Sequence, residues 1–168
     1  LAALRSSPVL TKGATSAALA ALGDLLAQLL GGQGAAQAID AARLCRFAAV
    51  NGILVGPAFH VWYGWLSTAV AQRGLRGALR RTILDQLVFS PAFLFVFLSC
   101  VRSTSASPVA LMPPPLELWL KASCANWLVL PITQFMNFLV VPVQLQVLFS
   151  NVVAVGMSAV MSYLASSP

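Results

Sequence analysis

The chain has 168 residues, of which 59% are hydrophobic and only 8% are charged, and its formal net charge is +6. Soluble domains carry about 25% charged residues, so this composition excludes an ordinary soluble domain and indicates an integral membrane protein. The bases are few and stand between apolar segments, which excludes a nucleic-acid-binding surface. We therefore expect an all-α integral membrane helical bundle of four to five membrane helices, formed by residues 1–168 as a single membrane-embedded helical domain.

The N-terminal part predicts one short membrane helix. Residues 1–12 form a polar-basic lead-in, and an Ala/Leu-rich helix is expected at 14–30. This helix is barely long enough to cross a bilayer, which takes about 20 residues. Asp24 lies in its second half, and an acid there is expected to face protein or water because lipid does not solvate charge. The sequence GGQGAAQ, 31–37, predicts a loop after the helix.

The longest uncharged run of the first half, 47–72, predicts the second membrane helix. Gly52 and Gly56 have the small-xxx-small spacing that lets another helix approach closely. Pro57 is expected to kink the helix, because proline lacks the backbone N–H and its ring clashes with the preceding turn. The aromatic residues of an interfacial belt are predicted near the end of this helix: Trp62, Tyr63 and Trp65.

A basic cluster separates the second and third predicted helices. Its members are Arg73, Arg76, Arg80 and Arg81. Arginines between two spans predict a loop on the positive side of the membrane. The third helix is expected at 82–101, with Asp85 and Gln86 near its start, and the i, i+4 spacing suggests an ion pair between Arg81 and Asp85. A Pro-rich loop is predicted at 103–117, because a Pro-Pro-Pro run cannot continue a helix.

The final stretch, 122–168, contains no charged side chain, which indicates chain embedded in a membrane. A fourth helix is predicted at 119–138 and a fifth at 143–164. A break is expected between them, since the residue before Pro142 resists helical geometry. One stripe of the fourth helix carries Trp127, Pro131, Gln134 and Phe138, with Asn137 beside Gln134.

Polar side chains inside the predicted helices are the main candidates for function. They are Asp24, His60, Asp85, Gln86, Gln134, Asn137, Gln146 and Asn151. Such residues usually face the interior of a bundle. Two interpretations stay open: a hydrophilic path, or interhelical hydrogen bonds worth about 0.6 kcal/mol each. The candidate pore-lining or interhelical residues are Asp24, His60, Asp85, Gln86, Gln134 and Asn137, and the candidate packing residues are Gly52, Gly56, Pro57, Trp127, Pro131 and Pro142.

Patterns of catalysis or metal binding are missing from the sequence. It has no Ser/His/Asp signature, no Gly-rich phosphate loop and no pair of neighbouring carboxylates. The three cysteines, Cys45, Cys100 and Cys124, are isolated in apolar context. We interpret the single histidine, His60, as a packing and hydrogen-bonding residue rather than a metal or pigment ligand. We expect no enzymatic activity, no metal and no cofactor, apart from bound lipid.

Four stretches, in chain order, resemble the motifs of one membrane-protein family. They are PVLTKGATSAALAALGDLLAQ, GPAFHVWYGWL, LRRTILDQLVFSPAF and NWLVLPITQFMNFLVVP, and together they cover nearly the whole chain. The chain thereby resembles the Mpv-seventeen type family, which includes the twenty-two-kilodalton peroxisomal membrane protein and mitochondrial inner-membrane relatives. It departs from the family pattern where a tryptophan is replaced by Leu130, where an arginine is replaced by Gln146, and at Val160, where a tryptophan is usual.

The resemblance implies four membrane spans and a nonselective pore or small-solute channel. It also implies an organellar location, the mitochondrial inner membrane or alternatively a peroxisomal or plastid membrane. The departures from the pattern favour an alternative function as a non-catalytic accessory or structural subunit of a large membrane complex, such as a respiratory, ATP synthase or photosynthetic assembly. The expected partners are membrane lipid and either other membrane protein subunits or further copies of the chain; nucleic acid is not expected.

Overall fold

The computed structural model describes residues 6–30, 39–106 and 113–166, with the side chains of 103–106 and 158–166 left undescribed. All regular structure in these ranges is helical, which confirms the all-α prediction. The chain divides into two compact units: Leu1–Ala58 with Val147–Pro168, and Phe59–Gln146. We call them the first and second unit and describe each by itself. The expectation of a single domain stays a prediction.

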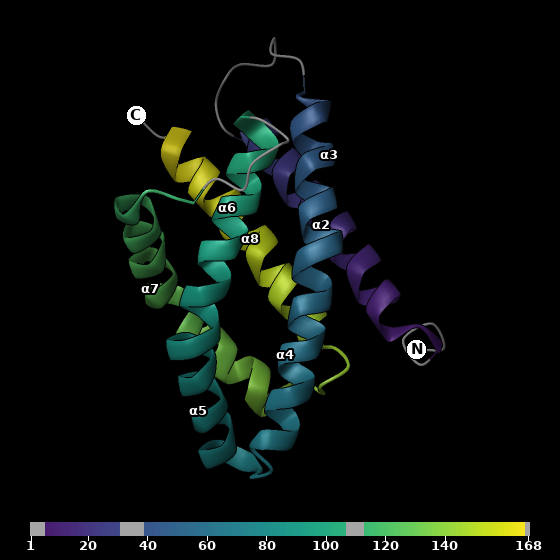
Figure 1. Ribbon diagram of the computed structural model, residues 1–168, viewed down its shortest axis with the longest axis vertical. Helices are drawn as coiled ribbons and strands as arrows, with labels where there is room; N and C mark the ends of the chain where they lie inside the picture. The colour runs from purple at the N-terminus through teal and green to yellow at the C-terminus, as the bar shows by residue number, and fades with distance from the viewer. Residues whose placement is uncertain (1–5, 31–38, 107–112, 167–168) are drawn as a thin grey trace. The chain divides into compact units, whose positions relative to one another are not determined.

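The first unit is built on helix α2 (Pro8–Leu30), which packs against α3 (Ala41–Val50) and the π-helical turn η1 (Asn51–Val55) (Figure 1). Most of helix α8 (Gln146–Ser166) also belongs to this unit.

Glycines allow the close approach of α2 to η1 and the start of α4 (Gly56–Ala69). A Cβ atom on Gly13 would lie 2.8 Å from the carbonyl oxygen of Gly52, and one on Gly56 would lie 2.7 Å from Cα of Gly13. The small-xxx-small pair of the sequence therefore lies at a contact of backbone with backbone.

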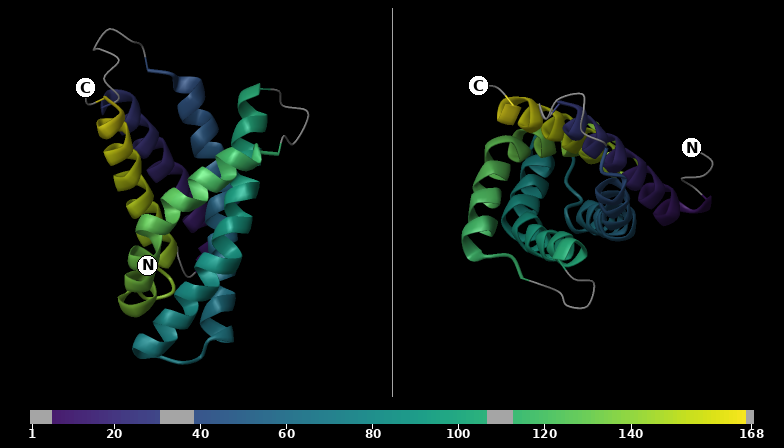
Figure 2. Two further views of the ribbon diagram at one scale, coloured as in Figure 1. Left: turned by 90° about the vertical axis from the view of Figure 1, so that its left-hand side faces the viewer. Right: turned by 90° about the horizontal axis from the view of Figure 1, so that it is seen from above.

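The second unit contains the rest of α4, followed by α5 (Gly74–Leu84), the π-helical turn η2 (Asp85–Phe89), α6 (Ser90–Ala106) and α7 (Leu116–Val140). Helix α7 packs against both α5 and α6 (Figure 2). The contact between α6 and α7 includes a hydrogen bond from Nε1 of Trp119 to the carbonyl of Pro91 at 3.0 Å.

Two prolines follow the two π-helical turns. Pro57 comes two residues after η1 ends, and Pro91 comes two residues after η2 ends. The N–H of Gly56 donates to the carbonyl of Asn51, and that of Ser90 donates to Asp85, so each bond spans five residues. A π-turn widens the helix next to the proline ring, which would clash with a regular α-helical turn. The irregularity expected at Pro57 is therefore a π-turn within a continuous helix.

Four helices are long and apolar enough to cross a membrane: Pro8–Leu30, Ala41–Ala69, Gly74–Arg102 and Leu116–Val140. A shorter apolar helix covers Gln146–Met157 within the residues whose side chains are described. This confirms the predicted four to five membrane helices. The predicted break is also present, since α7 ends at Val140 and the N–H of Leu145 donates to the carbonyl of Pro142 at 2.8 Å.

The helices extend beyond the spans that hydropathy marks. Helix α2 begins at Pro8, inside the predicted lead-in, and α5 begins at Gly74, so most of the predicted arginine loop is helical. Leu, Ala and Arg all have a high helix propensity, so a helix that contains them extends beyond the residue at which the apolar run ends. The predicted Pro-rich loop at 103–117 is shorter at both ends, because α6 continues to Ala106 and α7 begins at Leu116. Residues 31–37, and 107–112 within that loop, lie outside the described chain.

The glycine contact predicts that Gly56→Ala destabilises the protein. Its methyl group would meet backbone atoms of Gly13, which cannot move aside as a side-chain end can. We expect a lower Tm in detergent, corresponding to about 1–3 kcal/mol of overpacking. The measurement is thermal unfolding followed by tryptophan fluorescence.

The matched control is Gly156→Ala in α8, where an added Cβ meets no atom within 4 Å. This variant should be neutral or gain up to about 1 kcal/mol of helix propensity. If Gly56→Ala and Gly156→Ala change Tm by the same amount, the close approach of the backbones at Gly56 is contradicted.

Candidate functional site

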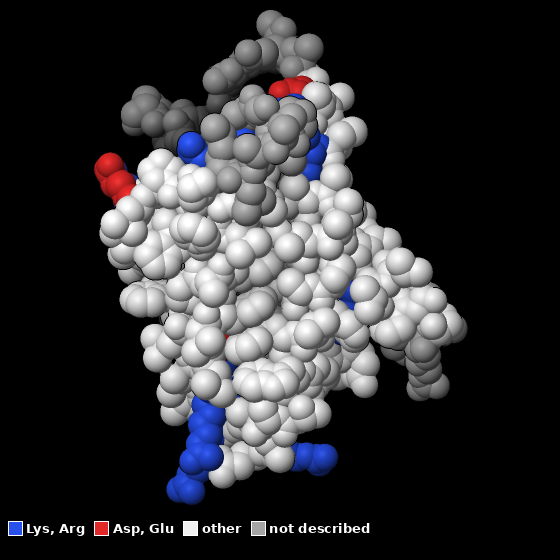
Figure 3. Space-filling view, in the orientation of Figure 1, with Lys and Arg blue, Asp and Glu red and all other residues white. Residues whose placement is uncertain are grey.

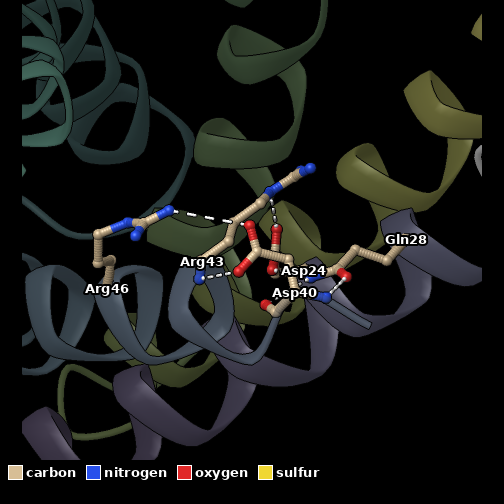
Figure 4. A network of polar contacts seen from close by, with 5 residues as sticks. All are labelled: Asp24, Gln28, Asp40, Arg43 and Arg46. Carbon is tan, nitrogen blue, oxygen red and sulfur yellow. Dashed lines mark hydrogen bonds and ion pairs between the residues drawn. The ribbon is translucent and has the colours of Figure 1, made fainter. Parts of the chain in front are cut away.

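A polar network in the first unit centres on Asp24 of α2, which is buried. Nε of Arg43 lies 2.9 Å from Oδ1 of Asp24, and Nε2 of Gln28 donates to Oδ2 at 2.8 Å (Figure 4). The N–H of Asp40 in turn donates to Oε1 of Gln28 at 2.8 Å. The network therefore connects α2 to the start of α3, and the charge of Asp24 is balanced by an arginine.

Asp40 caps the N-terminus of α3. Its Oδ1 accepts a hydrogen bond from the N–H of Arg43 at 2.8 Å, which satisfies one of the free donors at the helix start. Its Oδ2 lies 4.0 Å from a guanidinium nitrogen of Arg46, at an exposed site where an ion pair contributes little. Deeper in the same unit, Nδ2 of Asn151 donates to Oγ of Ser16 at 2.6 Å, which joins α8 to α2. These contacts are interhelical bonds with balanced charge.

A second network, in the second unit, centres on Asp85 at the start of η2, which is only 2% exposed. Nε1 of Trp62 donates to Oδ1 of Asp85 at 2.8 Å, and Nε2 of Gln86 donates to Oδ2 at 2.9 Å. The side chain of Gln134 on α7 also hydrogen-bonds to Asp85. The hydrogen bonds to this carboxylate in the described chain therefore come from neutral side chains.

The second network continues through amide groups along α7. Nε2 of Gln134 donates to the hydroxyl of Tyr63 at 2.8 Å, and Nδ2 of Asn137 donates to Oε1 of Gln134 at 2.9 Å. Asn137 also donates to the carbonyl of Gln146, whose own amide donates to Val141. A chain of hydrogen bonds thus runs from Asp85 to the turn after α7.

Gln86 contributes an acceptor as well as a donor to this network. Oε1 of Gln86 is buried and has no hydrogen-bond partner in the part of the chain that the structure describes. A buried acceptor in this state loses free energy unless water or another donor reaches it.

Aromatic rings lie beside Asp85. The ring of Trp62 stacks on Phe89 with centroids 4.7 Å apart, and Phe89 stacks on Phe93 at 5.1 Å. Phe59 contacts both phenylalanines. The carboxylate therefore lies next to low-dielectric groups, where an unbalanced charge costs more than in water.

The structure brings together most of the polar candidates from the sequence. Asp85, Gln86, Gln134 and Asn137 form one network, Asp24 belongs to the other, and His60 is half-buried on α4. The ion pair suggested between Arg81 and Asp85 is not formed; a guanidinium nitrogen of Arg81 donates to the carbonyl of Val70 at 2.7 Å instead.

The packing candidates take different positions. Gly52 and Gly56 lie at the backbone contact with α2, Pro57 follows η1, and Pro131 is half-buried inside α7. Pro142 lies exposed in the turn after α7, and Trp127 is 49% exposed, so only the second half of its predicted stripe, from Gln134 on, is buried.

Sequence reasoning missed several members of the networks. Trp62 and Tyr63 were assigned to an interfacial belt, yet their polar atoms bond to Asp85 and Gln134. The i, i+4 spacing of Asp24 and Gln28, and the position of Asp40 three residues before Arg43, were local signals that could have found the first network.

The family model described as Mpv17 / PMP22 family matches residues 117–162. Peroxisomal membrane protein 2 of Bos taurus is 36% identical over 97% of this chain and 84% of its own length, and Protein SYM1 of Gibberella zeae is 34% identical over 97% and 93%. This chain belongs to the Mpv17 / PMP22 family. The mitochondrial inner membrane protein Mpv17 of Drosophila melanogaster is 27% identical over 97% of the chain and 99% of its own. No solved structure matches the chain.

The match places this family member among integral membrane proteins, in agreement with its four candidate spans. The names of the relatives include both a peroxisomal membrane protein and a mitochondrial inner membrane protein, which are two of the locations that the sequence motifs implied.

The first network predicts different effects for two arginines of α3. Arg43→Gln should lower stability by about 1–3 kcal/mol, because it leaves the buried carboxylate of Asp24 without its charge partner. Arg46→Gln should cost no more than about 1 kcal/mol, because its pair with Asp40 is long and exposed.

Thermal unfolding of the two variants in the same detergent measures this difference. The substitution and the change in net charge are the same in both. If Arg46→Gln lowers Tm as much as Arg43→Gln, the ion pair with Asp24 does not stabilise the α2–α3 contact.

Proposed function

We propose that this family member forms a small-solute channel in an organellar membrane, and that the network around Asp85 lines the path of the solute. The observation that carries the proposal is the difference between the two buried acids. Asp24 is paired with Arg43, whereas Asp85 is surrounded by the neutral donors of Trp62, Gln86 and Gln134.

Interhelical hydrogen bonding alone does not account for a carboxylate at position 85. A neutral side chain such as asparagine could accept the hydrogen bond from Trp62. A charged carboxylate inside a membrane protein adds an electrostatic cost of at least about 2.5–3.5 kcal/mol on insertion scales unless water or a counter-charge offsets it. A hydrated path beside Asp85 would offset that cost, and its negative charge would favour cations over anions.

The buried side-chain oxygen of Gln86 also supports a hydrated path beside Asp85. Oε1 of Gln86 is buried beside the carboxylate, and a water molecule in a hydrated path would donate to it. Gln134 and Asn137 extend the polar wall along α7. Alternating donors and acceptors of this kind suit a path for small polar solutes rather than a site for one ligand.

The location is proposed from the relatives. One is named a mitochondrial inner membrane protein and another a peroxisomal membrane protein, and both are matched over nearly the whole of this chain. We propose the mitochondrial inner membrane for this protein, with the peroxisomal membrane as the alternative.

The channel proposal predicts that Asp85→Asn reduces the preference for cations several-fold. Asparagine keeps an acceptor for Trp62 but removes the charge that the path would use. The measurement is reversal potential and solute flux with purified protein reconstituted in liposomes. A parallel Tm measurement shows that the variant is folded.

The matched control is Glu117→Gln, which removes the same charge from an exposed side chain paired with Lys121. It should leave selectivity unchanged. Absence of conductance and flux for the unaltered protein at every potential and pH would remove the proposal, and the accessory-subunit alternative would replace it. Unchanged selectivity in folded Asp85→Asn would remove Asp85 from the path.

A further inference from the structure

The exposed side of α5 combines arginines with apolar side chains. We define the basic-apolar face by the exposed residues Arg73, Arg76, Arg80, Leu75, Leu79 and Ile83. Residues 76, 79, 80 and 83 follow the i, i+3, i+4, i+7 spacing of one helix face, and Arg73 directly precedes the helix. The opposite side of α5 is buried and consists of small residues: Gly77, Ala78 and Thr82. The basic-apolar face therefore points away from the rest of the second unit.

The arginines of this face are not balanced by acidic residues. The chain has four acids. Asp24 is paired with Arg43, Asp40 lies against Arg46, Glu117 is paired with Lys121, and Asp85 is buried among neutral donors. Arg73, Arg76 and Arg80 thus form no ion pair within the described residues, and the charge of this face is open to a partner.

Arg81 shows the contrast within the same helix. It is half-buried, and its guanidinium group donates to the carbonyl of Val70 at 2.7 Å, so it serves the fold of the unit. In Figure 3, Lys and Arg atoms gather at the end of the second unit where α5 begins, while the neighbouring surface is uncharged. Positive charge is therefore concentrated where the candidate span Gly74–Arg102 starts.

The position along the span matches a lipid headgroup. Arg80 lies about 6 Å along the axis from Arg76, since an α-helix rises about 1.5 Å per residue, and Arg73 directly precedes the helix. The long stems of these arginines let the guanidinium groups reach towards water and headgroups. Leu79 is 53% exposed and Ile83 46% exposed, and Leu87, four residues further on, is 64% exposed. These side chains continue the face into the depth of the acyl chains.

We propose that the basic-apolar face of α5 binds an anionic phospholipid. Arg73, Arg76 and Arg80 contact its phosphate, and Leu75, Leu79 and Ile83 contact its acyl chains. Guanidinium groups bind phosphate through two parallel hydrogen bonds, which an anionic headgroup offers without the competing ammonium group of phosphatidylcholine. The site does not depend on the channel, because neither the network around Asp85 nor the solute path includes these side chains.

The test uses the full chain purified in detergent and titrated with phosphatidylglycerol, phosphatidylcholine or inorganic phosphate. Bound lipid is counted by native mass spectrometry, and Tm is measured in parallel. We expect more phosphatidylglycerol than phosphatidylcholine bound at equal concentration, a rise in Tm with phosphatidylglycerol only, and a smaller preference at high salt because salt screens exposed charges.

The variant Arg76→Gln/Arg80→Gln should lose the preference for phosphatidylglycerol several-fold. The matched control, Arg46→Gln/Lys121→Gln, removes the same net charge from other exposed positions and should keep the preference. The proposal is overturned if both double variants behave alike, if the α5 variant keeps the preference, or if inorganic phosphate alone raises Tm as much as the lipid. Conversely, loss of binding in the α5 variant with an unchanged Tm in detergent alone supports the site directly.

Discussion

A helix surrounded by lipid has no water to satisfy its polar side chains, and this constraint determines how the helices of each unit meet. In the first unit, Asp24 of α2 meets an arginine of α3 and a glutamine of its own helix, and the amide of Asn151 meets Ser16. In the second, Asp85 accepts hydrogen bonds from Trp62 and Gln86, and Gln134 donates to the hydroxyl of Tyr63. Each polar side chain that faces protein therefore fixes the rotation of its own helix.

Close contact between backbones is the second interaction that holds these helices together. It acts at positions that the polar side chains do not reach. Gly13, Gly52 and Gly56 let α2 approach η1 and the start of α4 to a distance that excludes even a methyl group. Lipid tails are as apolar as the helices, so association in a membrane depends on such packing rather than on the hydrophobic effect. The π-turns before Pro57 and Pro91 have a related consequence, because they keep two long helices continuous through residues that would otherwise break them.

The charged residues are distributed by the same constraint. Asp24 and Asp85, two acids inside candidate spans, are buried, whereas the arginines at the start of α5 are exposed next to apolar side chains. Asp24 has a basic partner, whereas the hydrogen bonds to Asp85 in the described chain come from neutral side chains. A charge partner or water can reduce the cost of such a charge, and at Asp24 the structure shows the charge partner.

The sequence by itself determined the class of protein, the all-α fold and the set of polar residues that matter, because the cost of a charge or amide in lipid is a property of the residue and its segment. It also carried the resemblance to the family, which relatives that are 34% and 36% identical over 97% of the chain confirm. Hydropathy marked the apolar centre of each helix but not its ends, and so it missed that the arginines after Gly74 are helical.

Only the tertiary structure decided which polar groups meet. Asp85 bonds to Trp62, which lies far from it in sequence, and not to Arg81 one turn away, while Asp24 finds its partner on the next helix. These pairings depend on the rotation of each helix about its axis and on the π-turn that begins at Asp85. A one-residue change of register turns a side chain by about 100°, given the 3.6 residues of a helical turn, and no pattern along one segment specifies that angle against a neighbour.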